Sequence, residues 1–208
     1  MSAAIAIGFF TSAAAGILAA LLLAPFQELG RFFFILNAGL AFLFLCLAAP
    51  YRVSSQAGWS AAWILALLSM VLVIAYLAAL LILRGDRSSR GLLVPAAAAA
   101  LLAAAADGRL AAGASGPLWA FGLNAVCASM LLGSVIVGML LGHWYLVRAR
   151  LDISHLVVFA RFFAAAVFGR AVLFVIGLIG AASLSASGME LFLKTTAVDR
   201  GFFFWQRV

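Results

Sequence analysis

The chain has 208 residues, of which 68% are hydrophobic and 9% charged, and its formal net charge is +7. An ordinary soluble domain is roughly half apolar and a quarter charged, so this composition excludes a soluble fold, which could not bury so much apolar surface. The arginines lie mostly between apolar runs. We therefore interpret them as topology signals and contacts for lipid phosphates, and the sequence disfavours nucleic acid as a partner.

Six stretches have the roughly 20 apolar residues that a helix needs to cross a hydrocarbon core about 30 Å thick. They predict an all-α fold, a polytopic transmembrane helix bundle over residues 1–182. The spans lie at about 5–26, 31–49, 59–83, 91–106, 119–147 and 155–182. No basic side chain precedes the first apolar run, unlike a secretory signal peptide, so we expect that helix to remain in the mature protein.

Two prolines define how these spans are expected to end and begin. Pro50 is predicted to terminate the second span, because proline removes a backbone donor. The fourth span is short and rich in alanine, which is a weak membrane residue, and Pro95 should lie in its first turn to be harmless. We expect this span to pack against neighbouring helices rather than lipid.

Orientation follows from where the arginines fall. Trp119 and Trp144 open and close the fifth span about 37 Å apart, close to the separation of the two interfacial belts. The turns after spans one, three and five hold six arginines, whereas the turns on the opposite side hold two. This distribution places the N-terminus outside. We predict a multi-pass protein of a bacterial inner membrane. The six are Arg31, Arg84, Arg87, Arg90, Arg148 and Arg150; the two are Arg52 and Arg109.

The last segment, residues 183–208, differs from the spans. It is amphipathic over SLSASGMELFLKTTAVDR and then begins a new apolar run, GFFFWQRV. Two interpretations stay open: a membrane-surface anchor or the start of a seventh apolar helix.

The fifth span carries a stripe of mainly small or polar residues, called here the small-residue stripe. At 100° per residue its members fall within about 80° of one another. Because glycine lets another backbone or a flat cofactor approach closely, the stripe predicts a close contact with a helix, a porphyrin or a quinone tail. Its residues are Asn124, Cys127, Leu131, Ser134, Gly138 and Gly142.

The chain has two histidines, His143 in the fifth span and His155 at the start of the sixth. One interpretation is interfacial hydrogen bonding. The other is a pair of axial ligands to one haem b, because a hairpin between the two spans brings both to a similar depth. Cys46 and Cys127 lie in apolar runs with no CxxC spacing, so we interpret both as small buried hydrophobic residues.

Arg161 and Arg170 lie inside the sixth span, whereas every acid lies at or beyond a predicted span end. An arginine at the bilayer centre costs at least about 3 kcal/mol, so these two predict an anion from outside the chain. Candidates are a lipid phosphate, a haem propionate, a substrate or a partner's carboxylate. Alternatively, residues 153–168 lie along the membrane surface and both arginines snorkel to headgroups.

These residues favour a protein that is not catalytic by itself. Hydrolysis needs a nucleophile with a base, paired aspartates or a histidine cluster, and none is spaced for it. We predict an integral subunit of a larger membrane complex, of the electron-transfer kind, that anchors other subunits and holds haem, quinone or lipid. The alternatives are a permease for a small anionic solute, and an assembly or regulatory membrane protein without a ligand.

Overall fold

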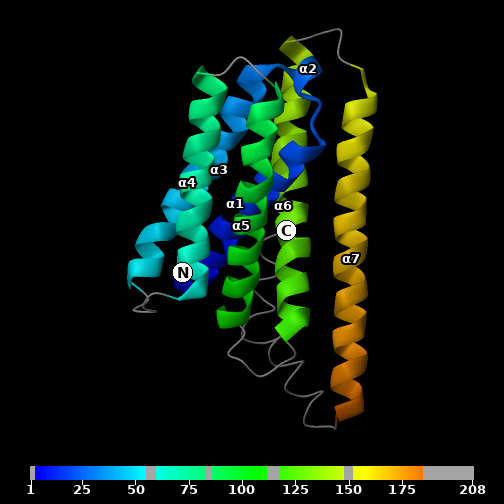
Figure 1. The fold of residues 1–208 in the computed structure, drawn as a ribbon. Coiled ribbons are helices and arrows are strands. Elements are labelled where there is room, and N and C mark those ends of the chain that lie inside the picture. The colour runs from blue at the N-terminus through cyan, green and yellow to red at the C-terminus, as the bar shows by residue number, and fades with distance from the viewer. Residues whose placement is uncertain (1–2, 55–59, 83–85, 112–117, 148–151, 185–208) are drawn as a thin grey trace. The chain divides into compact units, whose positions relative to one another are not determined.

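The computed structural model describes residues 3–54, 60–82, 86–111, 118–147 and 152–184, and within them every regular element is a helix (Figure 1). The predicted C-terminal segment beyond residue 184 and the predicted cytoplasmic residues Arg84, Arg148 and Arg150 lie outside the described residues. The helices are α1 Ala3–Leu23, α2 Phe26–Leu29, α3 Arg31–Ser54, α4 Ala61–Ile82, α5 Asp86–Ala111, α6 Leu118–Val147 and α7 Ser154–Leu184.

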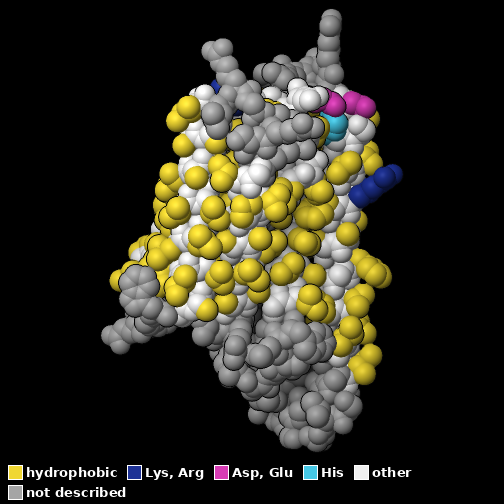
Figure 2. Space-filling model, in the orientation of Figure 1, with side chains coloured by type: hydrophobic (Ala, Val, Ile, Leu, Met, Phe, Trp, Pro, Cys, Tyr) yellow, Lys and Arg dark blue, Asp and Glu magenta, His cyan; other side chains and the backbone are white. Residues whose placement is uncertain are grey.

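Six of these helices are long and apolar enough to cross a membrane, which confirms the predicted polytopic bundle of a multi-pass membrane protein. Large exposed hydrophobic side chains occur along α3, α4, α6 and α7, as suits helices that face lipid (Figure 2). The second span was predicted to end at Pro50, but it does not. Instead α3 continues to Ser54 with Pro50 inside it, and the extra turn keeps Arg52 within the helix.

Helix α1 forms the centre of the packing, in contact with α3, α5 and α6. Every residue from Thr11 to Leu21 is buried. The side chains on this stretch are mostly alanine or other small groups, so three neighbouring helices can approach α1 from different sides. The first helix is therefore a core element of the bundle rather than a peripheral anchor.

The alanine-rich α5 packs against α4, α1 and α6, as predicted, which explains how a weakly hydrophobic span is accommodated. The hydroxyl of Ser69 on α4 donates a hydrogen bond of 3.2 Å to the carbonyl of Ala96 on α5. The candidate span is Gly91–Gly108, but the helix itself begins earlier, at Asp86, so Pro95 lies in its third turn and not in its first as predicted. The buried alanines are Ala96, Ala97, Ala99, Ala100, Ala103 and Ala104.

The closest approach between helices joins α1 to α6. A Cβ atom at Gly16 would overlap the backbone of Ser129 and Gly133, and one at Gly133 would overlap Gly16. Cβ atoms at Gly138 and Gly142 would meet nothing within 4 Å. Among the described residues, no helix therefore approaches these two glycines as closely as α1 approaches Gly133.

The face of α6 that packs against the bundle is centred about 140° around the helix axis from the centre of the small-residue stripe. Its residues recur every four positions and are all buried: Ala125, Ser129, Gly133, Val137 and Leu141.

The chain divides into two compact units, Met1–Val167 and Phe168–Val208, and the boundary falls inside α7. In the first unit, Ser154–Val167 of α7 lies beside α6, and its buried side chains are Phe159 and Ala166. This arrangement disagrees with the alternative in which residues 153–168 form a separate surface segment. The described part of the second unit is the remainder of α7.

Candidate functional site

A buried ion pair joins α3 to α5 and contacts α1. The Arg52 guanidinium donates from Nη1 to Asp107 Oδ1 at 2.8 Å and from Nη2 to Asp107 Oδ2, so the contact is bidentate. Nη2 also donates to the Thr11 hydroxyl at 2.9 Å. The two charged side chains are only 6% and 4% exposed, and Thr11 is fully buried.

Both members of this pair lie within helices, although both were predicted to lie outside the spans. Asp107 was placed beyond the end of the fourth span, but α5 runs on to Ala111 and the span Gly91–Gly108 includes it. Arg52, predicted to lie in an external turn, is likewise inside the span Arg31–Val53. For Arg52 the available signal was the absence of a helix-ending residue directly after it; Asp107 is followed by Gly108, and α5 continues through this glycine to Ala111.

The two charges of the pair offset each other, and the pair connects the C-terminal parts of α3 and α5 to the middle of α1. Removing one member of a buried ion pair costs about 3–5 kcal/mol, whereas replacing both with apolar residues is neutral or stabilising by about 1–4 kcal/mol. Ionisable groups inside spans also mark ion or substrate pathways in many membrane proteins. The pair is therefore both a structural element and a candidate site.

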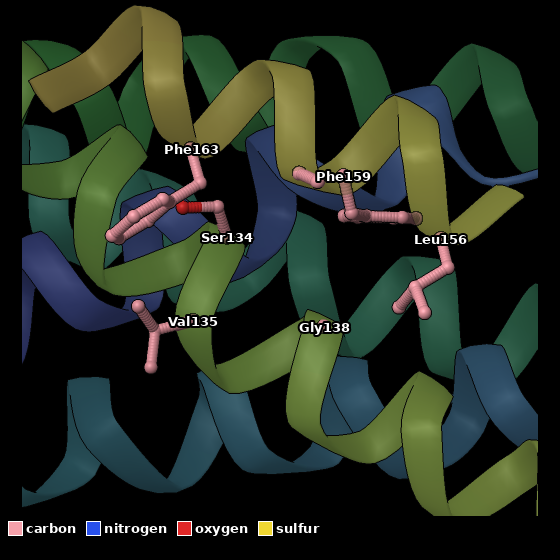
Figure 3. Close-up of a pocket in the computed structure, with 7 residues that line it drawn as sticks. Ser134, Val135, Gly138, Leu156, Phe159 and Phe163 are labelled. Carbon is pink, nitrogen blue, oxygen red and sulfur yellow. The ribbon is translucent and has the colours of Figure 1, made fainter. Parts of the chain in front are cut away.

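A groove of about 270 Å³ lies between α6 and the first unit's part of α7 (Figure 3). Six of its seven lining residues are apolar, and the hydroxyl of Ser134 donates to the Leu131 carbonyl at 2.8 Å. The groove therefore suits a hydrocarbon chain rather than a polar ligand. It is lined by Ser134, Val135 and Gly138 of α6 and by Leu156, Phe159, Ala160 and Phe163 of α7.

The small-residue stripe contributes only in part to this groove. Ser134 and Gly138 line it, and the bare backbone of Gly138 faces Leu156 and Phe159 across it (Figure 3). Gly142 is not among the lining residues, and Asn124 is exposed. The predicted face of α6 is thus turned toward α7, whereas the close contact with α1 uses a different face of α6.

The two histidines lie near the same end of the bundle in different surroundings. His143 is exposed on α6. His155 is half-buried, and its Nε2 atom contacts the carboxylate of Glu28 on α2, an ion pair when the histidine is protonated. Neither lines the groove, but His155 directly precedes the lining residue Leu156.

The turn before α7 is held by Asp152. Its carboxylate accepts a hydrogen bond of 3.1 Å from the backbone N–H of Ser154, and its carbonyl accepts one from the Tyr145 hydroxyl. The bonds from Ser154 hold the pKa of Asp152 below its usual range. Nearby, Trp144 Nε1 donates to the Leu29 carbonyl at 3.1 Å, which ties α6 to α2. Aromatic and charged groups therefore mark one interfacial level. Figure 2 shows acidic and histidine side chains next to one another near the top of the view.

The two arginines of the sixth predicted span behave differently. Arg161 is exposed on α7 and outside the groove lining. Arg170 belongs to the second unit, is half-buried and takes part in an interaction of its own.

Within the described ranges, no group of three or more His, Cys, Asp or Glu side chains could hold a metal ion. Cys46 and Cys127 are half-buried free thiols. No protein-family model, curated protein or solved structure matches the chain. Its function must therefore be inferred from the ion pair, the groove and the arrangement of charges.

Proposed function

We propose that the protein is an integral subunit of a larger membrane complex of the electron-transfer kind, and that the α6–α7 groove holds the isoprenoid tail of a quinone. The groove carries this proposal. Its lining is apolar, its one hydroxyl already donates to a backbone carbonyl, and the missing side chain of Gly138 leaves room for a chain to lie against α6. A tail without polar groups matches such a lining.

The groove also has an end that suits a polar head. Leu156 follows His155, whose imidazole contacts the Glu28 carboxylate at the interfacial level of the bundle. A quinone whose tail occupied the groove would present its oxygens to hydrogen-bonding groups there. The acyl chain of a phospholipid shares the chemistry of the tail, so the experiment must separate the two sources.

Haem b is a less suitable cofactor for the same subunit. His143 and His155 would be its axial ligands, and Arg161 would meet a propionate. The Nε2 atom of His155 is engaged by Glu28, so a metal bond would use Nδ1 or displace that carboxylate. A reduced-minus-oxidised optical spectrum of the purified protein tests this assignment, and absence of absorbance in the haem region would end it.

The quinone is tested by extracting the protein purified from native membranes with organic solvent and separating the extract by chromatography with redox detection. Gly138→Leu adds a bulky side chain at the groove, and its Cβ atom would meet nothing within 4 Å. Gly39→Leu on α3 is the matched control, with equally open space around its Cβ. We expect quinone in the wild type and the control but not in Gly138→Leu.

Other results of the solvent extraction would count against the proposal. Phospholipid alone, lost on Gly138→Leu, would leave a lipid-binding groove and remove the electron-transfer assignment. Equal quinone in all three proteins would show that the groove is not its site. Subunits that co-purify with the wild type would identify the complex, and a protein that purifies alone would favour a regulatory or assembly protein without a ligand.

A permease for a small anion is a second candidate, and the buried Arg52–Asp107 pair favours it. A carboxylate substrate would compete with Asp107 for the Arg52 guanidinium. The double variant Arg52→Met/Asp107→Leu keeps the interior neutral and removes the site. Loss of carboxylate uptake into proteoliposomes, with the fold retained, would support the permease, and unchanged uptake would exclude the pair as its substrate site.

A further inference from the structure

The face of α7 opposite the groove carries one cationic side chain. Arg161 is exposed, and no described residue pairs with it through a hydrogen bond or an ion pair. Phe159 and Phe163 of the groove lining point about 160° away around the helix. Whatever meets Arg161 therefore lies outside the groove and is distinct from the ligand proposed there.

The surroundings of Arg161 on this face are apolar. Val157, Val158, Ala164 and Ala165 lie within about 60° of it around the helix, and all four are exposed. Hydrocarbon can cover these side chains, but a guanidinium left among them costs at least about 3 kcal/mol at full depth. The face thus combines a surface for acyl chains with one group that requires an anion.

The depth of Arg161 determines which anion can reach it. It lies seven residues after Ser154, the first residue of α7, or about 10 Å along the axis. The turn just before α7 is at the interfacial level, because Tyr145 donates to the Asp152 carbonyl there. The Cα–Cβ bonds of a helix tilt toward its N-terminus, so the long side chain of Arg161 extends toward that level.

We infer that Arg161 binds the phosphate of a phospholipid whose acyl chains cover this face of α7. The guanidinium fork matches phosphate oxygens in a bidentate manner, and headgroup phosphates lie in the direction in which the side chain extends. A carboxylate on a partner's helix would have to be buried at the same depth, at a cost of its own, whereas the phosphate is already at the membrane surface. In the predicted orientation this leaflet is cytoplasmic, where anionic lipids gather.

The test is a titration of the delipidated full chain with phosphatidylglycerol, followed by native mass spectrometry that counts bound lipids. Arg161→Ala should weaken the tightest binding step at least about tenfold, because a hydrogen-bonded charge pair is lost. Arg161→Lys keeps the positive charge but not the guanidinium fork, so its affinity for the lipid should lie between those of the wild type and Arg161→Ala. Val158→Ala, on the same face, is the control and should bind like the wild type.

Two results would overturn the inference. One is an unchanged tightest step in Arg161→Ala, or in Arg161→Gln should the alanine variant fold poorly. The other comes from a photoreactive residue in place of Val158 in native membranes: cross-links to a polypeptide rather than to lipid would identify a protein partner on this face. Since the groove is not involved, Gly138→Leu should leave the phosphatidylglycerol binding step unchanged. The proposed lipid site and the proposed quinone site can therefore be refuted separately.

Discussion

Replacing Arg52 with methionine should destabilise the bundle strongly, because it leaves the Asp107 carboxylate buried without its bidentate partner. Asp107 is 4% exposed and has the Thr11 hydroxyl as its nearest alternative partner, which cannot neutralise it. Breaking such a pair costs about 3–5 kcal/mol. At roughly 2–4 °C per kcal/mol for a chain of this size, the apparent thermal midpoint should fall by roughly 6–20 °C.

The double variant Arg52→Met/Asp107→Leu separates the loss of the pair from the loss of packing. With both charges gone the interior is neutral and similarly filled, so stability should return to the wild-type level or above. The assay is the loss of the monodisperse peak in detergent after heating, measured for the wild type, both single variants and the double variant. Val53→Met, an exposed neighbour on α3, controls for the new methionine. A double variant no more stable than Arg52→Met would refute the reasoning.

Three further predictions follow from single contacts. Gly16→Ala should prevent α1 from packing on α6, because its Cβ would overlap the Ser129 carbonyl. Gly138→Ala is the control and should purify with the wild-type yield. Equal yields of the two variants would contradict the close contact between α1 and α6. Asp152→Ala should lower the thermal midpoint at neutral pH. Its lowered pKa means that the contribution of Asp152 is present above about pH 4 and lost as the pH falls through the folded value, so wild type and variant should converge in acid. Trp144→Phe keeps the ring but loses a hydrogen bond to α2 and should cost about 0.5–1.5 kcal/mol, seen as a small fall in the same midpoint.

The sequence predicts the number of spans because run length and hydrocarbon thickness are directly comparable. It does not predict where α3 ends. Proline is tolerated inside membrane helices when neighbouring groups satisfy the freed backbone, so Pro50 is a poor stop signal. The error had a large consequence, since the residues after Pro50 include Arg52 and hence one half of the ion pair.

The face of α6 that meets α1 cannot be identified from α6 alone. Both Gly138 and Gly133 are compatible with a close contact, and the choice between them depends on Gly16, which lies on another helix far away in the sequence. Periodicity on one helix cannot identify the partner. The predicted stripe was nevertheless informative, because its Ser134 and Gly138 line the groove that faces α7.

The ion pair could not be assigned from the sequence because neither charge looks embedded in its own apolar run. Arg52 and Asp107 each lie near the end of a span, where charges are usual. Only the packing of α1, α3 and α5 buries them together. Arg161, by contrast, was recognisable from the sequence as a cation in a span, since no pairing is needed to see it.

The central position of α1 sets an order for biogenesis. This helix is synthesised before α5 and α6, which carry the aspartate that shares a guanidinium with its Thr11 and the glycine that it meets. During translation α1 must therefore remain in the bilayer with its small side chains facing lipid or a chaperone. The described helices can close around α1 only after α6 has been synthesised.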